Sequence, residues 1–118
     1  MQEKGGEKMQ NHRQFFRVRL FDEPVILQSE HGFYHGIIRD LSGNGISLYL
    51  GEDIEFEECI VEFTLKDEHY VLSAKKVRKE KTSYGEYIYA CTFTNLPEKT
   101  QSTILSLLLR LDAIRRKK

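Results

Sequence analysis

Apolar and polar residues alternate along most of this chain. In the segment 15–21, Phe16, Val18 and Leu20 fall on one side, while the intervening arginines and phenylalanines fall on the other. A period of two residues predicts a half-buried β-strand. Similar short runs follow at 25–27, 33–40 and 46–50, separated by turn-forming residues. This punctuation favours an antiparallel meander.

Three longer alternating runs follow an acidic connection at 52–58. We expect strands near 58–66, 69–80 and 84–95, joined by connections short enough for hairpins. About seven strands in so short a chain predict a mainly β fold, a small antiparallel six- to seven-stranded β-barrel, because ring closure removes exposed strand edges. One face of the first of these strands carries Cys59, Val61, Phe63 and Leu65, and one face of the last carries Tyr87, Tyr89, Cys91 and Phe93.

The C-terminal segment changes to a helical period. Pro97 suits the first turn of a helix, and apolar residues recur at helical spacing from there to the end of the chain. We expect a helix at about 97–116. Leu105 and Leu109 widen its apolar stripe, and two explanations stay open: these leucines cover a barrel mouth, or they form a helix-to-helix contact in a homodimer. The stripe itself consists of Ile104, Leu107, Leu108, Leu111 and Ile114.

Length and composition indicate one folded domain. The chain has 118 residues, 40% of them hydrophobic and 31% charged, and its 18 Lys and Arg residues balance 18 Asp and Glu residues. Zero net charge provides no global attraction to nucleic acid or to anionic membranes, so any anion site has to be local. No apolar run approaches the roughly 20 residues of a membrane span, and no signal peptide is visible. We therefore expect a cytoplasmic protein without membrane insertion, with a flexible leader at 1–11 and one domain at 12–118.

The residue types that carry catalysis or metal binding are not arranged for either role. Cys59 and Cys91 lie far apart in sequence at alternating positions of expected strands, which favours reduced core residues over a disulfide or a metal site. Ser42 has no nearby histidine, and no carboxylate pair is placed for acid–base work. We expect no enzyme, no cofactor and no metal. The four histidines that lack metal-ligand spacing are His12, His31, His35 and His69.

A basic and aromatic cluster lies at 12–19, where the leader meets the first strand. Arg13 and Arg17 are four residues apart, a spacing that places both side chains on one face in a helix and in a strand. A guanidinium group binds a phosphate or a carboxylate through two hydrogen bonds, and it also meets the O6 and N7 acceptors of guanine. The alternative is a pair of solvated arginines on an edge strand.

A second cluster, at 40–46, lies between two expected strands. A tight turn alone explains Gly43 and the Asn44-Gly45 pair, because positive φ angles are easiest for these residues. A turn does not require Asp40 and Ser42, two residues apart at the strand end. A carboxylate accepts from the N1 and N2 donors of guanine, a pair that adenine lacks, and a hydroxyl donates to a phosphate. The two clusters together predict a site for guanine and phosphate.

Combined in this order, the two motifs resemble the PilZ domain, a bacterial receptor module for the second messenger cyclic di-GMP. Arg13-x-x-x-Arg17 precedes Asp40-x-Ser42-x-x-Gly45 in a small barrel that ends in a helix, and the resemblance covers roughly residues 10–116. It implies that the two arginines clamp the ligand. It also implies that Asp40 reads guanine, Ser42 binds phosphate and Gly45 permits the turn. Gly43 is a further candidate for the site, because a glycine allows the backbone to approach a ligand closely.

Two further positions follow from the same resemblance. His12 stands where many family members have a basic residue, and that neighbouring side chain helps to decide whether one cyclic di-GMP or an intercalated pair is held. Arg78, on a later strand, is a candidate for an additional ligand contact, with a solvated strand residue as the alternative.

The resemblance implies a receptor that works by coupled ordering. The arginine segment would fold over the dinucleotide and change the surface offered to an effector protein that controls motility, exopolysaccharide synthesis or virulence. Two alternatives stay open: a small nucleic-acid-binding barrel, and a ligand-independent adaptor that acts through the leucine-rich helix. Alternation weakens the first, because it makes Tyr87 and Tyr89 core residues. The basic and aromatic residues that suggest it are Lys75, Lys76, Arg78, Lys79, Lys81, Tyr84, Tyr87 and Tyr89.

Overall fold

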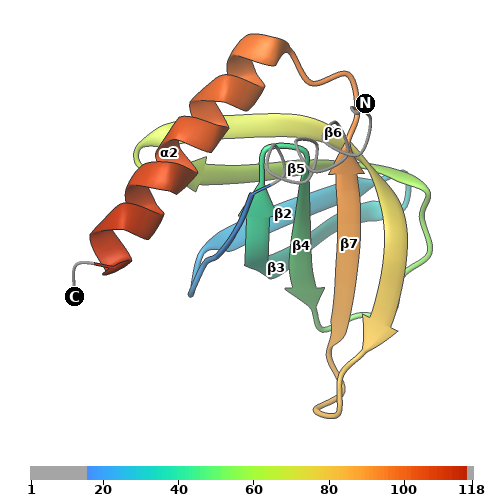
Figure 1. The fold of residues 1–118 in the computed structure, drawn as a ribbon. Helices are drawn as coiled ribbons and strands as arrows, with labels where there is room; N and C mark the ends of the chain where they lie inside the picture. The colour runs from blue at the N-terminus through green and yellow to red at the C-terminus, as the bar shows by residue number, and fades with distance from the viewer. Residues whose placement is uncertain (1–15, 117–118) are drawn as a thin grey trace, which may run out of the picture.

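A computed structural model describes residues 16–116 of the chain (Figure 1). The described residues form seven β-strands followed by one α-helix, as the alternation and the later helical period predict. The elements are β1 (Arg17–Arg19), β2 (Pro24–Ser29), β3 (Gly32–Ser42), β4 (Gly45–Leu50), β5 (Glu58–Leu65), β6 (Glu68–Lys81), β7 (Tyr87–Phe93) and α2 (Glu98–Arg116).

Six of the strands close into an antiparallel ring (Figure 1). Around the ring the order is β2, β3, β4, β7, β6 and β5, and β5 then pairs with β2. The strand β1 lies outside the ring, where three of its residues pair with the end of β3. The predicted barrel of six to seven strands is therefore confirmed.

The pairing differs from a simple meander. Neighbouring strands form the expected hairpins at β2–β3, β3–β4, β5–β6 and β6–β7. The meander prediction for the first four strands is wrong at β1, which pairs with β3 instead of β2. A second departure from sequence order is the pairing of β4 with β7 instead of β5. Ring closure explains the second departure: the pairing of β4 with β7 satisfies backbone groups that would otherwise form an open edge.

The core lies inside the ring and takes one face of each strand. The inward residues of β5 and β7 are those that alternation predicts, including the buried Cys59 and Cys91. A hydrogen bond between these two thiols lowers the pKa of Cys59 and raises the pKa of Cys91. Burial raises the pKa of Cys91 further. Both cysteines are thus core residues, as expected.

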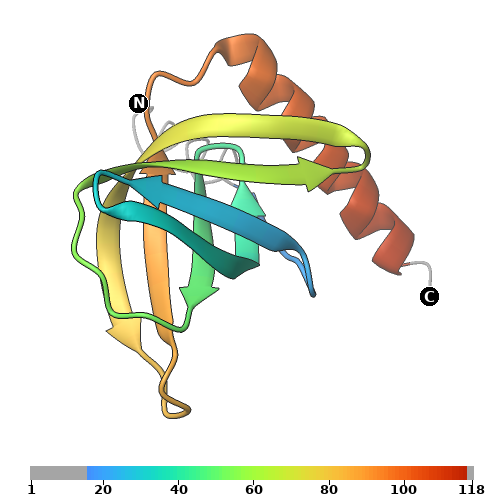
Figure 2. The ribbon, with the colours of Figure 1, turned by 180° about the vertical axis from the view of Figure 1, so that it is seen from behind.

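The helix α2 packs beside the barrel against β1 and β3, and Figure 2 shows it from behind. Its buried residues are Ile104, Leu107 and Leu108, while Leu105 is half-buried and Leu109 is exposed. The extra leucines therefore lie at the border of the packed stripe or beyond it. Within the described part of the chain, no helix has the length and apolar character needed to cross a membrane.

Candidate functional site

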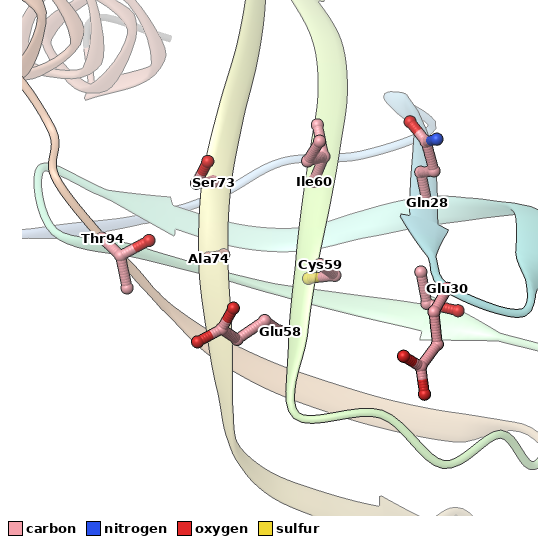
Figure 3. A pocket seen from close by; sticks show the side chains of 9 residues that line it. Gln28, Glu30, Glu58, Cys59, Ile60, Ser73, Ala74 and Thr94 are labelled. Carbon is pink, nitrogen blue, oxygen red and sulfur yellow. The ribbon is translucent and has the colours of Figure 1, made fainter.

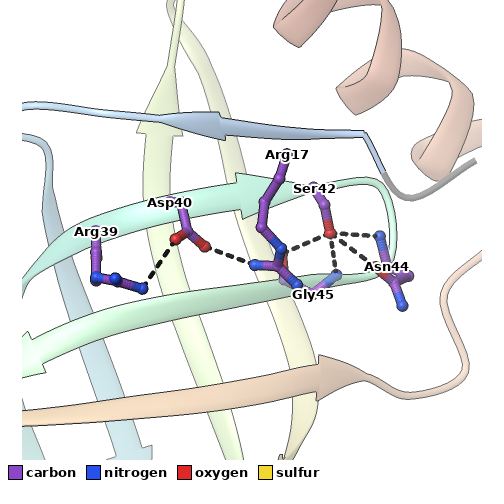
Figure 4. A network of polar contacts seen from close by, with 6 residues as sticks. All are labelled: Arg17, Arg39, Asp40, Ser42, Asn44 and Gly45. Carbon is purple, nitrogen blue, oxygen red and sulfur yellow. Dashed lines mark hydrogen bonds and ion pairs between the residues drawn. The ribbon is translucent and has the colours of Figure 1, made fainter. Parts of the chain in front are cut away.

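A β-bulge in β3 determines which side chains of this strand face the candidate site. Ile38 pairs with Leu48 and Asp40 pairs with Ser47, so Arg39 is one residue in excess on its strand. A bulge shifts the alternation of side chains by one position. Ile38 therefore points into the core, whereas Arg39 and Asp40 both project from the same side of β3 (Figure 4).

Two arginines hold the carboxylate of Asp40, one on each oxygen (Figure 4). Arg17 Nη1 lies 2.5 Å from Asp40 Oδ1, and Arg39 Nη1 lies 3.2 Å from Asp40 Oδ2. Asp40 is buried, with 7% of its surface exposed, and a buried carboxylate is tolerated only when it is paired and hydrogen-bonded. The side chain of Arg17 keeps 49% of its surface exposed, so it retains donors for a further partner.

Ser42 holds the turn between β3 and β4. Its buried hydroxyl oxygen accepts hydrogen bonds from the backbone N–H groups of Asn44, at 3.3 Å, and Gly45, at 3.1 Å. Its own O–H is 2.7 Å from Asn44 Oδ1 and 3.3 Å from the carbonyl oxygen of Gly45, and it donates to one of them at a time. Ser42 therefore fixes the end of β3 and the start of β4 relative to each other.

The glycine of this turn is needed for a different reason from the one expected. The positive φ angles that the structure records lie elsewhere, for example at Gly32 and Gly85, and none is recorded at 43–45. The expectation that left-handed backbone angles explain these glycines is therefore wrong. A Cβ on Gly45 would lie 2.5 Å from the carbonyl oxygen of Cys91, so Gly45 is required by the close approach of β4 to β7.

The residues of both motifs that the structure describes lie around the meeting point of β1, β3 and β4. Arg17 comes from β1, Asp40 and Ser42 from β3, and Gly45 from β4. Gly43 is in the turn, where its carbonyl oxygen accepts a hydrogen bond from Gln101 Nε2 of α2 at 3.0 Å. Two predicted site residues, His12 and Arg13, lie outside the described residues.

Arg78 lies on the outer face of β6, in one lateral row with Asp40. The strand registers pair Asp40 with Ser47, Ser47 with Ala90, and Ala90 with Arg78. Arg78 is three strands from Asp40, a span of about 14 Å at the usual strand spacing. Its guanidinium Nε lies 3.3 Å from Glu80 Oε2, and its side chain is exposed.

The comparisons with known proteins agree with this geometry. The family model of the PilZ domain matches residues 11–110, which is most of the chain. The chain belongs to the PilZ domain family. No curated protein matches it in sequence.

Several solved structures share the fold of this PilZ domain. The inhibitor of motility MotI/DgrA of Bacillus subtilis superimposes with a TM-score of 0.72 at 16% identity, over 86% of this chain and 51% of that one. The PilZ domain with c-di-GMP of YcgR from Escherichia coli gives a TM-score of 0.66 at 14% identity, over 89% and 95%. YcgR in complex with c-di-GMP gives 0.73 at 15% identity, over 89% and 48%. This chain thus spans about half the length of MotI/DgrA.

Two residues of the PilZ domain surface near Asp40 were missed in the sequence. Arg39 shares a side of β3 with Asp40 because of the bulge. The sequence signal for this is a break in the alternation: the apolar residues Ile38 and Leu41 are three residues apart. Ser47 lies opposite Asp40 on β4. No local pattern singles it out, because its position depends on the bulge in the neighbouring strand.

A hollow of about 190 Å³ lies beside Arg39, one of the two arginines that hold the carboxylate of Asp40. Its lining includes the aromatic residues Phe21 and Tyr49 and the charged residues Arg19, Arg39 and Asp22, so its cations outnumber its carboxylates by two to one. Guanidinium planes and aromatic rings are the groups on which nucleobases stack. This part of the surface therefore suits a planar, anionic ligand.

A larger hollow, of about 390 Å³, does not suit such a ligand (Figure 3). It lies over β2, β5 and β6 and shares no residue with the Arg17–Asp40 cluster. Glu30 and Glu58 are its charged lining residues, and it has no lysine or arginine. Two carboxylates without a cation repel phosphate groups.

Two of the basic residues of β6 are paired with the acidic connection between β4 and β5. Lys79 Nζ lies 2.6 Å from Asp53 Oδ1 and 2.8 Å from Glu55 Oε2, and these hydrogen bonds raise the pKa of Lys79. Lys76 also reaches Glu55, at 3.7 Å. Tyr89 is fully buried, as alternation predicts. The basic and aromatic residues that suggest binding of nucleic acid are thus partly paired with carboxylates and partly in the core.

Among residues 16–116, no group of three or more His, Cys, Asp and Glu side chains could hold a metal ion.

Proposed function

We propose that this PilZ domain is a receptor for cyclic di-GMP and not an enzyme. The observation that carries the proposal is the contact between Arg17 and Asp40, which are 23 residues apart in sequence and belong to two separate motifs. Folding brings a half-exposed guanidinium group and a carboxylate to one point on the outer barrel surface. The c-di-GMP complexes of the structurally similar YcgR support the same ligand class.

The acceptor capacity of Asp40 matches a guanine edge. An ionised carboxylate has about four lone-pair positions, and Arg17 and Arg39 use one each. Two positions remain, which equals the number of donors that N1 and N2 of guanine present. Asp40 therefore accepts from guanine without losing the arginines that keep it charged.

The arginines meet the phosphates in this proposal. Arg17 keeps donors free on its exposed side, and Arg13 supplies the second guanidinium group beside His12. The O–H of Ser42 rotates away from Asn44 and donates a hydrogen bond to a phosphate. Its oxygen continues to accept hydrogen bonds from the two backbone N–H groups of the turn. Gly43 and Gly45 are buried in the turn that Ser42 holds, so they act by letting the backbone close up next to the ligand. Arg78 provides the far contact on β6.

The output passes to a protein partner. Ligand binding draws the segment that carries Arg13 over the phosphates and changes the surface around β1. The helix α2 is in contact with the same region, through Gln101 and the carbonyl oxygen of Gly43, and it exposes Leu109. An effector protein, or a second copy of this chain, would therefore contact the altered surface around β1 and the exposed Leu109 together.

Isothermal titration calorimetry with cyclic di-GMP tests the proposal. We expect a micromolar dissociation constant, about −8 kcal/mol, and a loss of at least roughly tenfold in Arg17→Ala and Asp40→Asn, because each removes a charge-assisted hydrogen bond. Arg110→Ala removes an equal charge from the exposed side of α2 and should leave the constant unchanged. Wild-type protein that releases no heat, or an Arg17→Ala variant that binds equally well, would refute the assignment.

A further inference from the structure

The hydroxyl of Ser47 is an anomaly in the barrel wall. Ser47 is 2% exposed, and its Oγ has no hydrogen-bond partner among the residues that the structure describes. Most buried polar atoms in folded proteins have a partner, because an unpaired one loses its hydrogen bonds to water without replacement. Tyr70 Oη is in the same situation among the described residues, so the position of Ser47, and not the missing partner alone, has to show whether a ligand supplies the partner.

The position of Ser47 identifies where that group would come from. Ser47 is the direct cross-strand neighbour of Asp40, and directly opposed residues have Cβ atoms about 4.5–5.5 Å apart. The bulge at Arg39 places Asp40 on the outer side of the barrel, away from the inward-facing Ile38 and Leu41. Ser47 alternates with the buried Ile46 and Leu48, so it shares that outer side.

Ser47 is covered in the ligand-free structure, with 2% of its surface exposed, so a ligand reaches its hydroxyl only when neighbouring groups move aside. The two residues that flank it along the outer row are Asp40 and Ala90, and Gly45 precedes it on the same face of β4. Ala90 is half-buried, and Gly45 is buried against the carbonyl oxygen of Cys91. One lateral row thus runs from Asp40 through Ser47 and Ala90 to Arg78, with the two smallest side chains between the two charged ones.

We infer that Ser47 contacts the ligand of the proposed site and donates a hydrogen bond to O6 of the guanine whose N1 and N2 donors Asp40 accepts. The inference rests on the proposed function. On the Watson–Crick edge of guanine, O6 adjoins N1, so a donor placed beside the carboxylate completes recognition of all three positions of that edge. Adenine has an amino group where guanine has O6.

The test measures stability and binding of Ser47→Ala, with Ser73→Ala as the matched control, because Ser73 is an exposed serine on the outer face of β6. Without ligand, Ser47→Ala should have a melting temperature equal to or above that of wild type, since it removes an unpaired buried hydroxyl. Its dissociation constant for cyclic di-GMP should rise about tenfold, the change that corresponds to 1.4 kcal/mol. Ser73→Ala should change neither value.

A second ligand identifies the atom that is contacted. Cyclic di-IMP keeps O6 and N1–H but lacks the 2-amino group of guanine. Ser47→Ala should therefore weaken the binding of cyclic di-IMP and of cyclic di-GMP by the same factor. Asp40→Asn should weaken the binding of cyclic di-IMP by a smaller factor than the binding of cyclic di-GMP.

Three results would overturn the inference while leaving the receptor function intact. The first is an unchanged dissociation constant in Ser47→Ala. The second is a melting temperature below that of wild type, which would show that the hydroxyl already has a partner without ligand. The third is a loss confined to cyclic di-GMP, which would place the contact away from O6. Wild-type protein that does not bind cyclic di-GMP would refute the proposed function and this inference together.

Discussion

Substitution of Gly45 by alanine should destabilise the barrel at the seam between β4 and β7. The added Cβ would lie 2.5 Å from the carbonyl oxygen of Cys91, whereas ordinary contacts begin at 3.4 Å. The two strands therefore have to separate by most of an ångström at a point where their backbones are hydrogen-bonded. Overpacking of this kind costs about 2 kcal/mol, which lowers the melting temperature of a domain of this size by about 8–16 °C.

Circular dichroism during thermal unfolding measures the effect. Gly51→Ala is the matched control, because no atom lies within 4 Å of the Cβ that it would add; a compatible Gly-to-Ala change leaves stability unchanged or slightly raised. Gly45→Ala should also weaken cyclic di-GMP binding, since the displaced strand carries the turn that Ser42 holds. A melting temperature of Gly45→Ala within about 2 °C of Gly51→Ala would show that the seam is looser than its geometry implies.

Two further predictions concern the connection between β4 and β5. Tyr89→Phe should lower the free energy of unfolding in urea by about 1–3 kcal/mol, because the buried phenol accepts from Ile54 N at 2.8 Å and donates to the carbonyl oxygen of Glu52 at 2.9 Å; an unchanged unfolding midpoint would contradict this. The hydrogen bond and the charge of Lys79 lower the pKa of Glu55, so the stability that Glu55 contributes is present above its ordinary pKa and is lost as the pH falls through the folded-state pKa. Wild type should therefore lose more stability than Glu55→Gln when urea unfolding is compared at neutral and acidic pH, and equal losses would refute the coupling.

The secondary structure could be predicted from the sequence because it depends on local periodicity. Alternation identified the core faces of β5 and β7, and the change to a helical period identified α2. The order of strands in the ring could not be predicted in this way. The pairings of β4 with β7 and of β1 with β3 depend on closure of the whole sheet, which no short window of sequence contains.

The candidate site was accessible to sequence reasoning only in part. Arg17 and Asp40 stand out because their residue types and spacing match a chemical task. Arg39 and Ser47 do not, since one depends on a bulge that shifts the alternation of β3 and the other on the strand that then lies opposite. Gly45 was identified for the wrong reason: the approach of Cys91 from β7 is a tertiary contact, and a turn pattern cannot reveal it.

The location of β1 outside the six-stranded ring has a mechanical consequence. Only Arg17, Val18 and Arg19 pair with β3, and the ring remains complete without them. Separation of this strand from β3 would leave the hydrogen bonds of the ring intact, but it would expose the buried Val18. The guanidinium group of Arg17 is thereby carried by a strand that contributes three paired residues, so separating this strand costs less free energy than unfolding the domain.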